Sequence, residues 1–254
     1  MAVNVAISGF GRIGRLVLRS IIESKRKDIN VVAINDLAPV DTNAFLLAND
    51  TVHGPLNEKI SVKKNKMTIG RKTISVLNER DPQKLPWKKM KIDVALECTG
   101  LFTSKEKASM HIKAGAKKVL VSAPCSEADK TIVYGVNEQE ITRNDLVVSN
   151  ASCTTNCLAP VVKVLHEKFG IVHGYMTTIH AFTGDQSVLD TFHPDLRRAR
   201  AASMSMIPTS TGAAKAVGLV MPELSGKLDG TAIRVPTPNV SLIDFKFVSK
   251  KTMK

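Results

Sequence analysis

The sequence predicts an α/β protein, with a parallel-sheet domain followed by a second domain that is richer in strands. Over the first 150 residues, short runs of β-branched apolar residues alternate with segments of helical periodicity, and this alternation is typical of a parallel sheet. After about residue 150 the character changes, and residues 171–183 are rich in β-branched and aromatic residues. We therefore expect one domain over residues 1–150 and another over residues 151–254.

The chain begins with a strand–helix–strand unit. The segment "VNVAIS" (residues 3–8) predicts a short buried strand, and "INVVAIND" (residues 29–36) predicts a second one. Between them, "RLVLRSIIES" (residues 15–24) places apolar residues at helical spacing. A unit of about 35 residues with this order is the β-α-β building block of parallel sheets.

The same two periodicities predict the remaining elements. In the first domain we expect strands over residues 91–100, 117–124 and 145–153, a helix over residues 107–116, and a hairpin over residues 59–79 that turns near Asn65. In the second domain, residues 184–203 are polar with few cues for helix or strand, whereas residues 230–251 predict strands with a proline break. No internal repeat interrupts this order.

A glycine-rich turn lies between the first strand and the first helix. "GFGRIG" fits the pattern G-x-G-x-x-G with Gly9, Gly11 and Gly14, and Asp36 ends the next strand. This context is typical of a Rossmann-type dinucleotide-binding domain: Gly9 permits the tight turn, Gly11 lets a pyrophosphate approach the backbone, and Gly14 lets the helix pack on the strand. The carboxylate of Asp36 would bind the ribose hydroxyls and repel a 2′-phosphate. The motif therefore predicts NAD as the cofactor, in preference to NADP.

Composition restricts the class of protein. Hydrophobic residues make up 43% of the chain, no apolar run is long enough to span a bilayer, and the start "MAVNVAISGFGRIG" does not resemble a signal peptide. The four cysteines form no CxxC pair, which favours reduced thiols in the cytoplasm over a disulfide framework. The formal charge of +13 invites anionic partners, but no nucleic-acid-binding signature accompanies the basic clusters. We therefore expect neither a membrane partner nor specific nucleic-acid binding.

The stretch "NASCTTNCLAP" (residues 150–160) contains two cysteines, Cys153 and Cys157. The sequence after it predicts a helix that ends near Gly170, with Leu158, Val161, Val162 and Leu165 on one face. Cys153 would lie in the first turn of that helix, where the helix dipole and free N–H groups lower the pKa of a thiol and make it a nucleophile. Cys157 is one turn further along, and we expect it to be a small buried apolar residue. The two cysteines have no matching ligands nearby, so no metal site is predicted.

An activated thiol requires a base, and the residues alone do not identify it. His180 ends the strand "YMTTIH" close to Thr183, but it is one of six histidines in the chain. The candidates are His53, His111, His166, His173, His180 and His193.

Ten motifs occur in order and together resemble one family: "SGFGRIG", "VAINDL", "VHG", "ECTG", "VSAP", "NASCTTNCLAP", "TTIHAFTGDQ", "DLRRARAAS", "IPTSTGAAKAVG" and "RVPTPNVSLID". From residue 1 to about residue 245 the chain closely resembles the phosphorylating glyceraldehyde-3-phosphate dehydrogenases. The resemblance implies a glycolytic oxidoreductase that uses NAD to convert D-glyceraldehyde 3-phosphate and inorganic phosphate into 1,3-bisphosphoglycerate. It also implies a cytoplasmic homotetramer and an α+β catalytic domain that is incomplete here.

The resemblance also assigns roles to residues. Cys153 would attack the aldehyde and become a thioester, with His180 as its base and the backbone N–H of Cys153 as an oxyanion donor. The site for the substrate phosphate would comprise Thr183 and Arg234. The site for inorganic phosphate would comprise Ser152, Thr154, Arg198, Thr211 and Gly212, with Ser210 to Gly212 opening a helix. Cofactor contacts would come from Arg12, Ile13, Asp36, Arg80 and Ser122. Residues 181–203 match a loop that lies near the cofactor across a tetramer interface.

The chain departs from this family in two places. Thr191 and Phe192 stand where NAD-linked members usually have Leu-Pro, which weakens the prediction of strict NAD selectivity. The family also continues beyond "NVSLID" into further strands and a final helix that "FVSKKTMK" does not resemble. We therefore expect the 254-residue chain to be poorly stable and weakly active or inactive. The alternatives are an inactive NAD-binding remnant, with adventitious RNA binding, or an erythrose-4-phosphate dehydrogenase that hydrolyses its thioester. Arg198 in the phosphate site favours phosphorolysis.

Overall fold

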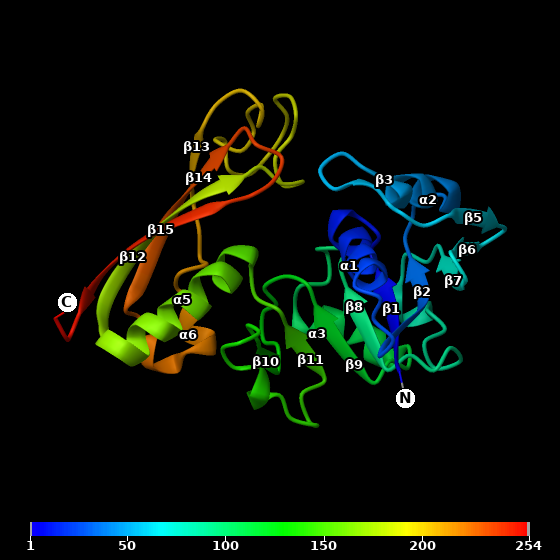
Figure 1. The fold of residues 1–254 in the computed structure, drawn as a ribbon, viewed down its shortest axis with the longest axis horizontal. Helices are drawn as coiled ribbons and strands as arrows, with labels where there is room; N and C mark the ends of the chain where they lie inside the picture. The colour runs from blue at the N-terminus through cyan, green and yellow to red at the C-terminus, as the bar shows by residue number, and fades with distance from the viewer. Residues whose placement is uncertain (1, 253–254) are drawn as a thin grey trace. The chain divides into compact units, whose positions relative to one another are not determined.

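A computed structural model describes residues 2–252 and divides into two units (Figure 1). The first unit holds the residues up to Thr131 together with Ile141–Asn150, and the second holds Ile132–Glu140 and the residues from Ala151 onward. A division at residue 150 therefore places residues 132–140 in the wrong unit. They join the second because Val133 and Val136 pack in the same apolar cluster as Leu158 and Val162.

The first unit is built on a nine-stranded sheet with the order β10-β11-β9-β8-β1-β2-β7-β6-β5. Its strands are β1 (Val3–Ser8), β2 (Ile29–Asn35), β5 (Ile60–Lys63), β6 (Lys66–Ile69), β7 (Lys72–Leu77), β8 (Val94–Glu97), β9 (Lys118–Val121), β10 (Lys130–Thr131) and β11 (Val147–Ser149). The strands from β10 to β7 pair in parallel, and β5 and β6 add an antiparallel edge. The strand order reverses beside β1, and in open α/β sheets ligands bind at the carboxyl edge at such a point. The predicted parallel sheet is confirmed.

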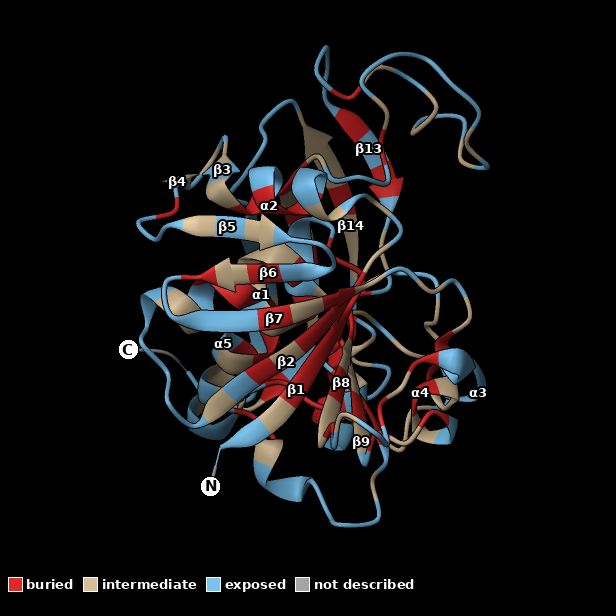
Figure 2. Ribbon diagram, turned by 90° about the vertical axis from the view of Figure 1, so that its right-hand side faces the viewer, coloured by how far each residue is buried: buried red, intermediate tan, exposed pale blue. Residues whose placement is uncertain are grey.

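Short helices connect these strands. They are α1 (Arg12–Glu23), α2 (Val40–Ala48), α3 (Lys105–Ala108), α4 (Met110–Lys113) and the 3-10 turn η1 (Pro82–Lys84), and a small ladder joins β3 (Asn49–Asp50) to β4 (Gly54–Pro55). Figure 2 shows buried residues concentrated along the central strands. Ile7 of β1 and Ile34 of β2 are fully buried and pack with Leu18 of α1, so the first strand–helix–strand unit forms as its periodicity predicts.

Two elements of the first unit differ from the sequence prediction. The expected hairpin is a three-stranded meander, because a second turn at Gly70 and Arg71 follows the predicted turn at Lys64 and Asn65. The helix expected over residues 107–116 is divided into α3 and α4 at Ser109. The hydroxyl of Ser109 donates to the carbonyl of Lys105 at 2.6 Å, and such bonds back to the preceding turn compete with regular helix geometry.

The second unit contains a four-stranded mixed sheet with the order β13-β14-β12-β15. Its elements are η2 (Glu138–Glu140), α5 (Cys153–Phe169), β12 (Ile171–Ala181), β13 (Ile207–Ser210), α6 (Val217–Val220), η3 (Pro222–Leu224), β14 (Leu228–Val235) and β15 (Leu242–Ser249). β12 pairs in parallel with β14 and antiparallel with β15. One face of this sheet packs on α5, where Leu158 and Val162 meet Met176 of β12 in a single apolar cluster. An α/β unit followed by an α+β unit is the fold class that the sequence predicts.

The helix α5 runs from Cys153 to Phe169 with Gly170 as its C-cap, as predicted, but two side chains that the prediction places on the buried side are exposed. Cys157 is exposed rather than buried, and Val161 is 52% exposed. Both lie with the exposed Val164 on one stripe of the helix, at spacings of four and three residues, whereas Leu158 and Val162 form the buried stripe. The prediction that Cys157 is buried is therefore wrong, because Cys157 lies on the exposed stripe of α5.

Within residues 2–252, none of the helices is both long enough and apolar enough to span a bilayer.

Candidate active site

The glycine-rich turn of the first unit has the geometry that its motif predicts. Gly9 has φ +87°, and a Cβ atom at this position would lie 2.6 Å from the backbone nitrogen of Thr99. A Cβ atom at Gly14 would lie 2.2 Å from the carbonyl oxygen of Gly9, so α1 packs closely on the end of β1. At Gly11, by contrast, no heavy atom lies within 4 Å of that position. The open side of the loop is therefore at Gly11, where a diphosphate would approach.

Free backbone donors line that open side. The N–H groups of Arg12 and Ile13 begin α1 and have no acceptor among residues 2–252, as expected for the first turn of a helix. The side chain of Asp36 lies beside the same loop: its carboxylate accepts hydrogen bonds from the N–H of Phe10 at 2.7 Å and of Ala38 at 2.9 Å. A carboxylate has about four acceptor sites, so Asp36 keeps capacity for ribose hydroxyls. These residues fit a dinucleotide.

Other predicted cofactor residues lie at the same carboxyl edge of the parallel sheet. Arg80 is exposed just after β7, and Ser122 follows β9, with its N–H bonded to the carbonyl of Glu97. The guanidinium of Arg12 is bound to Asp50 at 3.2 Å. The structure thus places all five predicted cofactor residues in the first unit, around the point where the strand order reverses.

A buried polar chain supports the turn on which Gly9 rests, and the sequence interpretation missed it. The carboxylate of Glu97 accepts from the N–H of Thr99 at 2.7 Å and contacts His111 Nε2 at 2.9 Å, while Trp87 Nε1 donates to His111 Nδ1 at 3.0 Å. Glu97, His111 and Trp87 are almost completely buried. A charged residue inside the apolar strand "VALEC" was the available signal. His111 is therefore a structural residue and not the base of the thiol.

The second unit brings Cys153 and His180 together. Ser152 caps α5, since its hydroxyl accepts from the N–H of Thr155 at 3.0 Å, and Cys153 is the first helical residue. Its Sγ lies 3.2 Å from Nε2 of His180, at the end of β12. Cys153 is an exposed residue whereas His180 is buried, so the nucleophile lies at the surface beside a buried imidazole. This is the geometry of an activated nucleophile beside a base.

The backbone fixes the orientation of the His180 ring. Nδ1 of His180 lies 2.7 Å from the carbonyl oxygen of Ala181, and Arg234 Nη1 donates to the same oxygen at 3.1 Å. Arg234 Nη1 also lies 3.0 Å from Nδ1. Because an unprotonated Nδ1 only 2.7 Å from the carbonyl oxygen would oppose two lone pairs, we assign the ring proton to Nδ1. Nε2 is then free to accept the thiol proton.

The electrostatics of the pair favour the ionised form. The hydrogen bond with His180 lowers the pKa of the Cys153 thiol, opposed by burial, and Thr154 contributes further. The bond to Cys153 raises the pKa of His180, with burial opposing and the Ala181 carbonyl assisting. Opposite shifts of the two partners favour a thiolate–imidazolium pair. The two groups titrate as a coupled pair.

The other four histidines have different environments. His53 and His173 are exposed, His166 accepts from the N–H of Ile171 at 3.0 Å, and His193 lies 3.4 Å from Asp185. Among residues 2–252, no hydrogen bond joins any of them to a cysteine.

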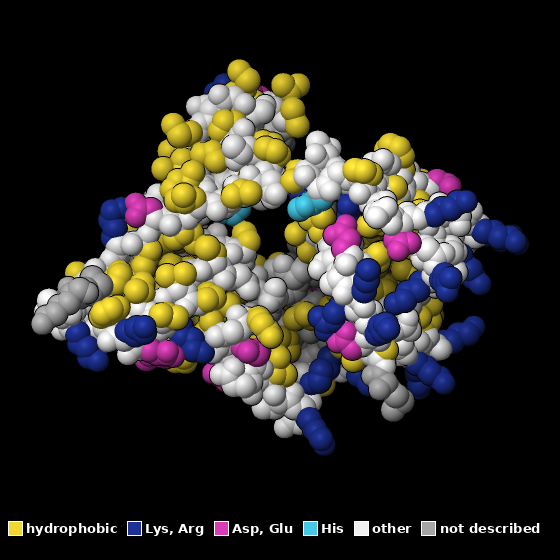
Figure 3. All heavy atoms as spheres, viewed as in Figure 1, with side chains coloured by type: hydrophobic (Ala, Val, Ile, Leu, Met, Phe, Trp, Pro, Cys, Tyr) yellow, Lys and Arg dark blue, Asp and Glu magenta, His cyan; other side chains and the backbone are white. Residues whose placement is uncertain are grey.

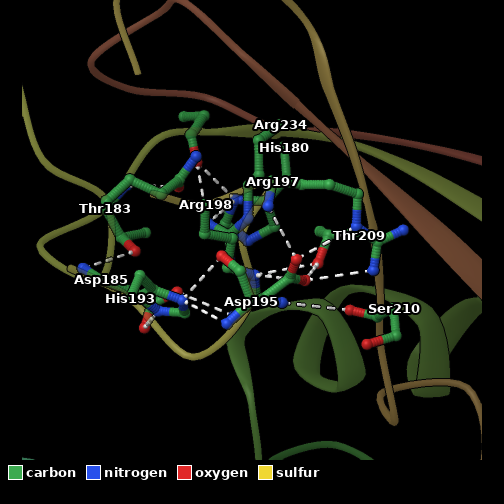
Figure 4. Close-up of polar contacts among 12 residues, drawn as sticks. His180, Thr183, Asp185, His193, Asp195, Arg197, Arg198, Thr209, Ser210 and Arg234 are labelled. Atoms are coloured by element: carbon green, nitrogen blue, oxygen red, sulfur yellow. Dashed lines mark hydrogen bonds and ion pairs between the residues drawn. The ribbon is translucent and has the colours of Figure 1, made fainter. Parts of the chain in front are cut away.

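A cluster of cations and hydroxyls lies in the same unit (Figure 4). The guanidinium of Arg198 donates to Asp185 at 2.8 Å, to the hydroxyl of Thr209 at 2.9 Å and to the carbonyl of Ser210 at 3.2 Å. Asp195 accepts from the same Thr209 hydroxyl at 3.1 Å. Asp185, Asp195 and Thr209 thus hold Arg198 in place. The sequence interpretation named none of the three, because they are 13, 3 and 11 positions from Arg198 and only the folded loop brings them together.

Arg234 has an unused donor. Its Nε atom is buried and has no hydrogen-bond partner among residues 2–252. Burial lowers the pKa of Arg234, and the positive charge of Arg198 adds to this effect, while the Cys153 thiolate opposes it. An anion at this place would supply the missing acceptor and reduce the repulsion between the two arginines. The site is therefore suited to a phosphate group.

The remaining residues predicted to bind substrate or phosphate are Ser152, Thr154, Thr183, Thr211 and Gly212. Ser152 and Thr154 begin α5, and the hydroxyl of Thr183 accepts from the N–H of Asp185 at 3.4 Å. Thr211 and Gly212 follow β13. The prediction that a helix begins at Ser210 to Gly212 is wrong, because α6 begins only at Val217 and has four residues. Between Gly212 and Val217 the chain forms isolated turns, one of which is closed by the hydrogen bond from the N–H of Ala216 to the carbonyl of Gly212. These residues therefore do not form an anion site at a helix N-terminus.

Comparisons with known proteins agree with this geometry. The family model for the NAD binding domain of glyceraldehyde 3-phosphate dehydrogenase matches residues 3–105, and the model for its C-terminal domain matches residues 152–254. Curated proteins named glyceraldehyde-3-phosphate dehydrogenase are also similar. One from Xanthobacter flavus is 66% identical over 251 residues, covering 99% of this chain and 75% of the relative. One from Zymomonas mobilis is 59% identical with the same coverage, and one from Geobacillus stearothermophilus is 57% identical over 96% of this chain and 72% of the relative. The chain thus spans about three quarters of the length of these relatives.

Proposed function

The chain belongs to the glyceraldehyde-3-phosphate dehydrogenase family, and on this premise we propose that it is an NAD-dependent, phosphorylating dehydrogenase of D-glyceraldehyde 3-phosphate. The product would be 1,3-bisphosphoglycerate, a glycolytic intermediate. The observation that supports this function best is the 3.2 Å contact between Cys153 Sγ and His180 Nε2 at the start of α5, in the unit that also holds Arg198 and Arg234.

Cys153 is the nucleophile of the proposed reaction. His180 Nε2 takes the thiol proton, and Sγ attacks the aldehyde carbon to form a thiohemiacetal. The N–H of Cys153, at the first turn of α5, is available to the oxygen that develops negative charge. NAD, when bound, supplies the hydride acceptor for oxidation to a thioester. Inorganic phosphate then attacks the thioester carbon, and Cys153 leaves as a thiolate that His180 stabilises.

The two phosphate groups of the reaction suit the two arginines. We assign Arg234 and Thr183 to the phosphate of the substrate, and Arg198, Ser152, Thr154, Thr211 and Gly212 to inorganic phosphate. The unpartnered Nε of Arg234 supports the first assignment. The positioning of Arg198 by Thr209 and Asp185 supports the second.

Asp185 competes with phosphate for Arg198 in this assignment. Replacement by asparagine keeps an oxygen at the acceptor position but removes the negative charge. We expect the KM for inorganic phosphate to fall by about 2- to 5-fold, the range of a partly exposed ion pair, with kcat changed less than about twofold. Steady-state kinetics at several phosphate concentrations measure this. Asp190→Asn, which removes the ion pair of Arg200 in the same loop, is the matched control. A raised KM in Asp185→Asn would show that Asp185 instead contributes to phosphate binding.

Asp36 selects the cofactor in this proposal, together with the open loop at Gly11 and the free donors of Arg12 and Ile13. Asp36→Ala removes both the ribose acceptor and the acceptor for Phe10 N–H. We expect the Kd for NAD to rise by about 10- to 100-fold, while the preference over NADP decreases, because hydrogen bonds to charged groups are lost. Calorimetry with both dinucleotides measures it. Asp36→Asn retains one oxygen and should have an intermediate Kd, and equal NAD affinity in all three proteins would exclude the role.

An assay of NADH formation tests the function. The purified chain is mixed with glyceraldehyde 3-phosphate and NAD, with and without inorganic phosphate. The proposal expects NADH whose rate depends on phosphate, in contrast to the weak activity or inactivity expected from the sequence. Phosphate-independent turnover, with preference for erythrose 4-phosphate, would instead indicate a hydrolysing dehydrogenase. A folded chain that binds NAD but forms no NADH would indicate a cofactor-binding remnant.

The proposal includes a cytoplasmic homotetramer, as the resemblance implies. The loop of residues 181–203 exposes several large apolar side chains, namely Val188, Leu189, Phe192 and Leu196. Clustered exposed apolar residues are typical of interfaces between chains. Light scattering after gel filtration measures the assembly, and a monomer at micromolar concentration would contradict it.

A further inference from the structure

A cavity of about 520 Å³ lies in the first unit, away from the residues assigned to the cofactor. It is bounded by the second half of α1, by β2 and by strands β6 and β7. Its floor is aliphatic and consists of Leu18, Ile21, Ile22, Val31, Ile69 and Ile74. Leu18, Val31, Ile69 and Ile74 are buried, so the floor belongs to the core of the unit and is preformed. Cavities of 300–1,000 Å³ with apolar walls are typical small-molecule sites.

The rim of this cavity is strongly basic. Lys25, Arg26 and Lys27 follow α1 on one side, and Arg71 and Lys72 lie at the turn between β6 and β7 on the other. The rim contains a single carboxylate, Glu58. Arg26 is bound to Asp28, but none of the other four cations lies in a carboxylate ion pair within residues 2–252. Figure 3 shows Lys and Arg side chains gathered on the first unit. The cations of the rim therefore outnumber its carboxylate Glu58 and the paired Asp28, and the mouth is net positive.

We propose that this cavity binds a single-chain fatty acid, with the aliphatic tail on the floor and the carboxylate at the mouth. The lining contains no aromatic side chain on which a nucleotide base could stack, and the floor residues have no side-chain polar atom to orient a sugar. Aliphatic walls favour an aliphatic chain through burial of apolar surface. Cations on two sides of the mouth favour an anionic head group over a neutral one. The site shares no residue with the glycine loop or with Asp36, so the inference does not depend on the proposed function.

Calorimetric titration of the whole chain with octanoate, decanoate and dodecanoate, below their micellar concentrations, tests the tail. Each buried methylene tightens binding about fourfold, so affinity should rise roughly 15-fold for each two-carbon step until the cavity is full. Decanol, which has the same tail without a charge, should bind more weakly than decanoate. Equal affinities along the series, or no binding of any of the three acids, would overturn the proposal.

Charge reversal tests the head group. Arg71 and Lys72 are exposed, so Arg71→Glu/Lys72→Glu should fold normally and lose at least about tenfold in decanoate affinity. Lys63→Glu/Lys64→Glu, at the other turn of the same meander, removes the same charge away from this cavity and should bind decanoate like the parent, with equal melting temperatures. An equal loss in both variants would mean non-specific attraction. Sedimentation with anionic phospholipid vesicles, in the absence of decanoate binding, would assign the basic rim to a membrane surface and overturn the fatty-acid site.

Discussion

Replacing Cys153 with serine is expected to lower kcat by at least about 10⁴-fold, as for other enzymes that lose their nucleophile. The serine hydroxyl has nearly the size of the thiol but remains protonated beside His180, so the attack on the aldehyde carbon loses its thiolate. NAD affinity should change less than about twofold, because the glycine loop and Asp36, which bind the dinucleotide in this proposal, are unaltered. NADH formation and cofactor titration measure the two quantities.

Cys157 supplies the matched control for this variant. It lies one turn further along α5, is exposed, and has no hydrogen bond to a histidine among residues 2–252. Cys157→Ser should therefore retain kcat within about twofold, the range of surface substitutions. A large loss in Cys157→Ser, or substantial turnover by Cys153→Ser, would contradict the assignment of the nucleophile.

The second large effect is expected from His180→Asn. Loss of a positioned base costs about 10²- to 10⁴-fold in kcat. The pKa of Cys153 should also rise, because the hydrogen bond and charge of His180 lower it and burial, which raises it, remains. In the parent, thiolate reactivity should persist as the pH falls below the ordinary range of a thiol. In His180→Asn the same reactivity should be lost at a higher pH.

The pH dependence of alkylation measures this shift without requiring turnover. Iodoacetamide reacts with the thiolate, and fragmentation of the peptide that contains both Cys153 and Cys157 gives the rate at Cys153 separately. His173→Asn, an exposed position of the same strand, should leave the profile unchanged. Identical profiles in the parent and in His180→Asn would show that the 3.2 Å contact does not control the thiol.

The sequence predicted features that local patterns determine. The glycine turn, α1 and β2 lie within 36 residues, and the tight packing of Gly9 and Gly14 follows from one motif. Both ends of α5 were equally local features, because Ser152 is a standard N-cap residue and Gly170 a standard C-cap residue. The orientation of Cys157 was not, since a shift of one residue in a helix moves a side chain by about 100° and decides between core and solvent.

Contacts between segments that are distant in the sequence could not be predicted from such local patterns. Cys153 and His180 are 27 residues apart, and their contact depends on the packing of α5 against β12. The residues that hold Arg198 come from a loop without periodicity and from β13. Glu97 can be noticed in the sequence as a carboxylate in an apolar strand. Its partner His111, and the Trp87 that binds His111, come from other segments and cannot be inferred from that strand. Sequence periodicity identifies which residues face inward, whereas these pairs depend on how elements pack.

The central claim, that Cys153 carries the acyl group of the reaction, is tested most directly by mass spectrometry. The chain is mixed with glyceraldehyde 3-phosphate and NAD in the absence of inorganic phosphate, quenched in acid and digested. The account predicts a 3-phosphoglyceroyl adduct that peptide fragmentation locates at Cys153, absent without NAD and removed when phosphate is added before the quench. An adduct on Cys157 or on another residue, or NADH formation without any adduct at Cys153, would contradict it.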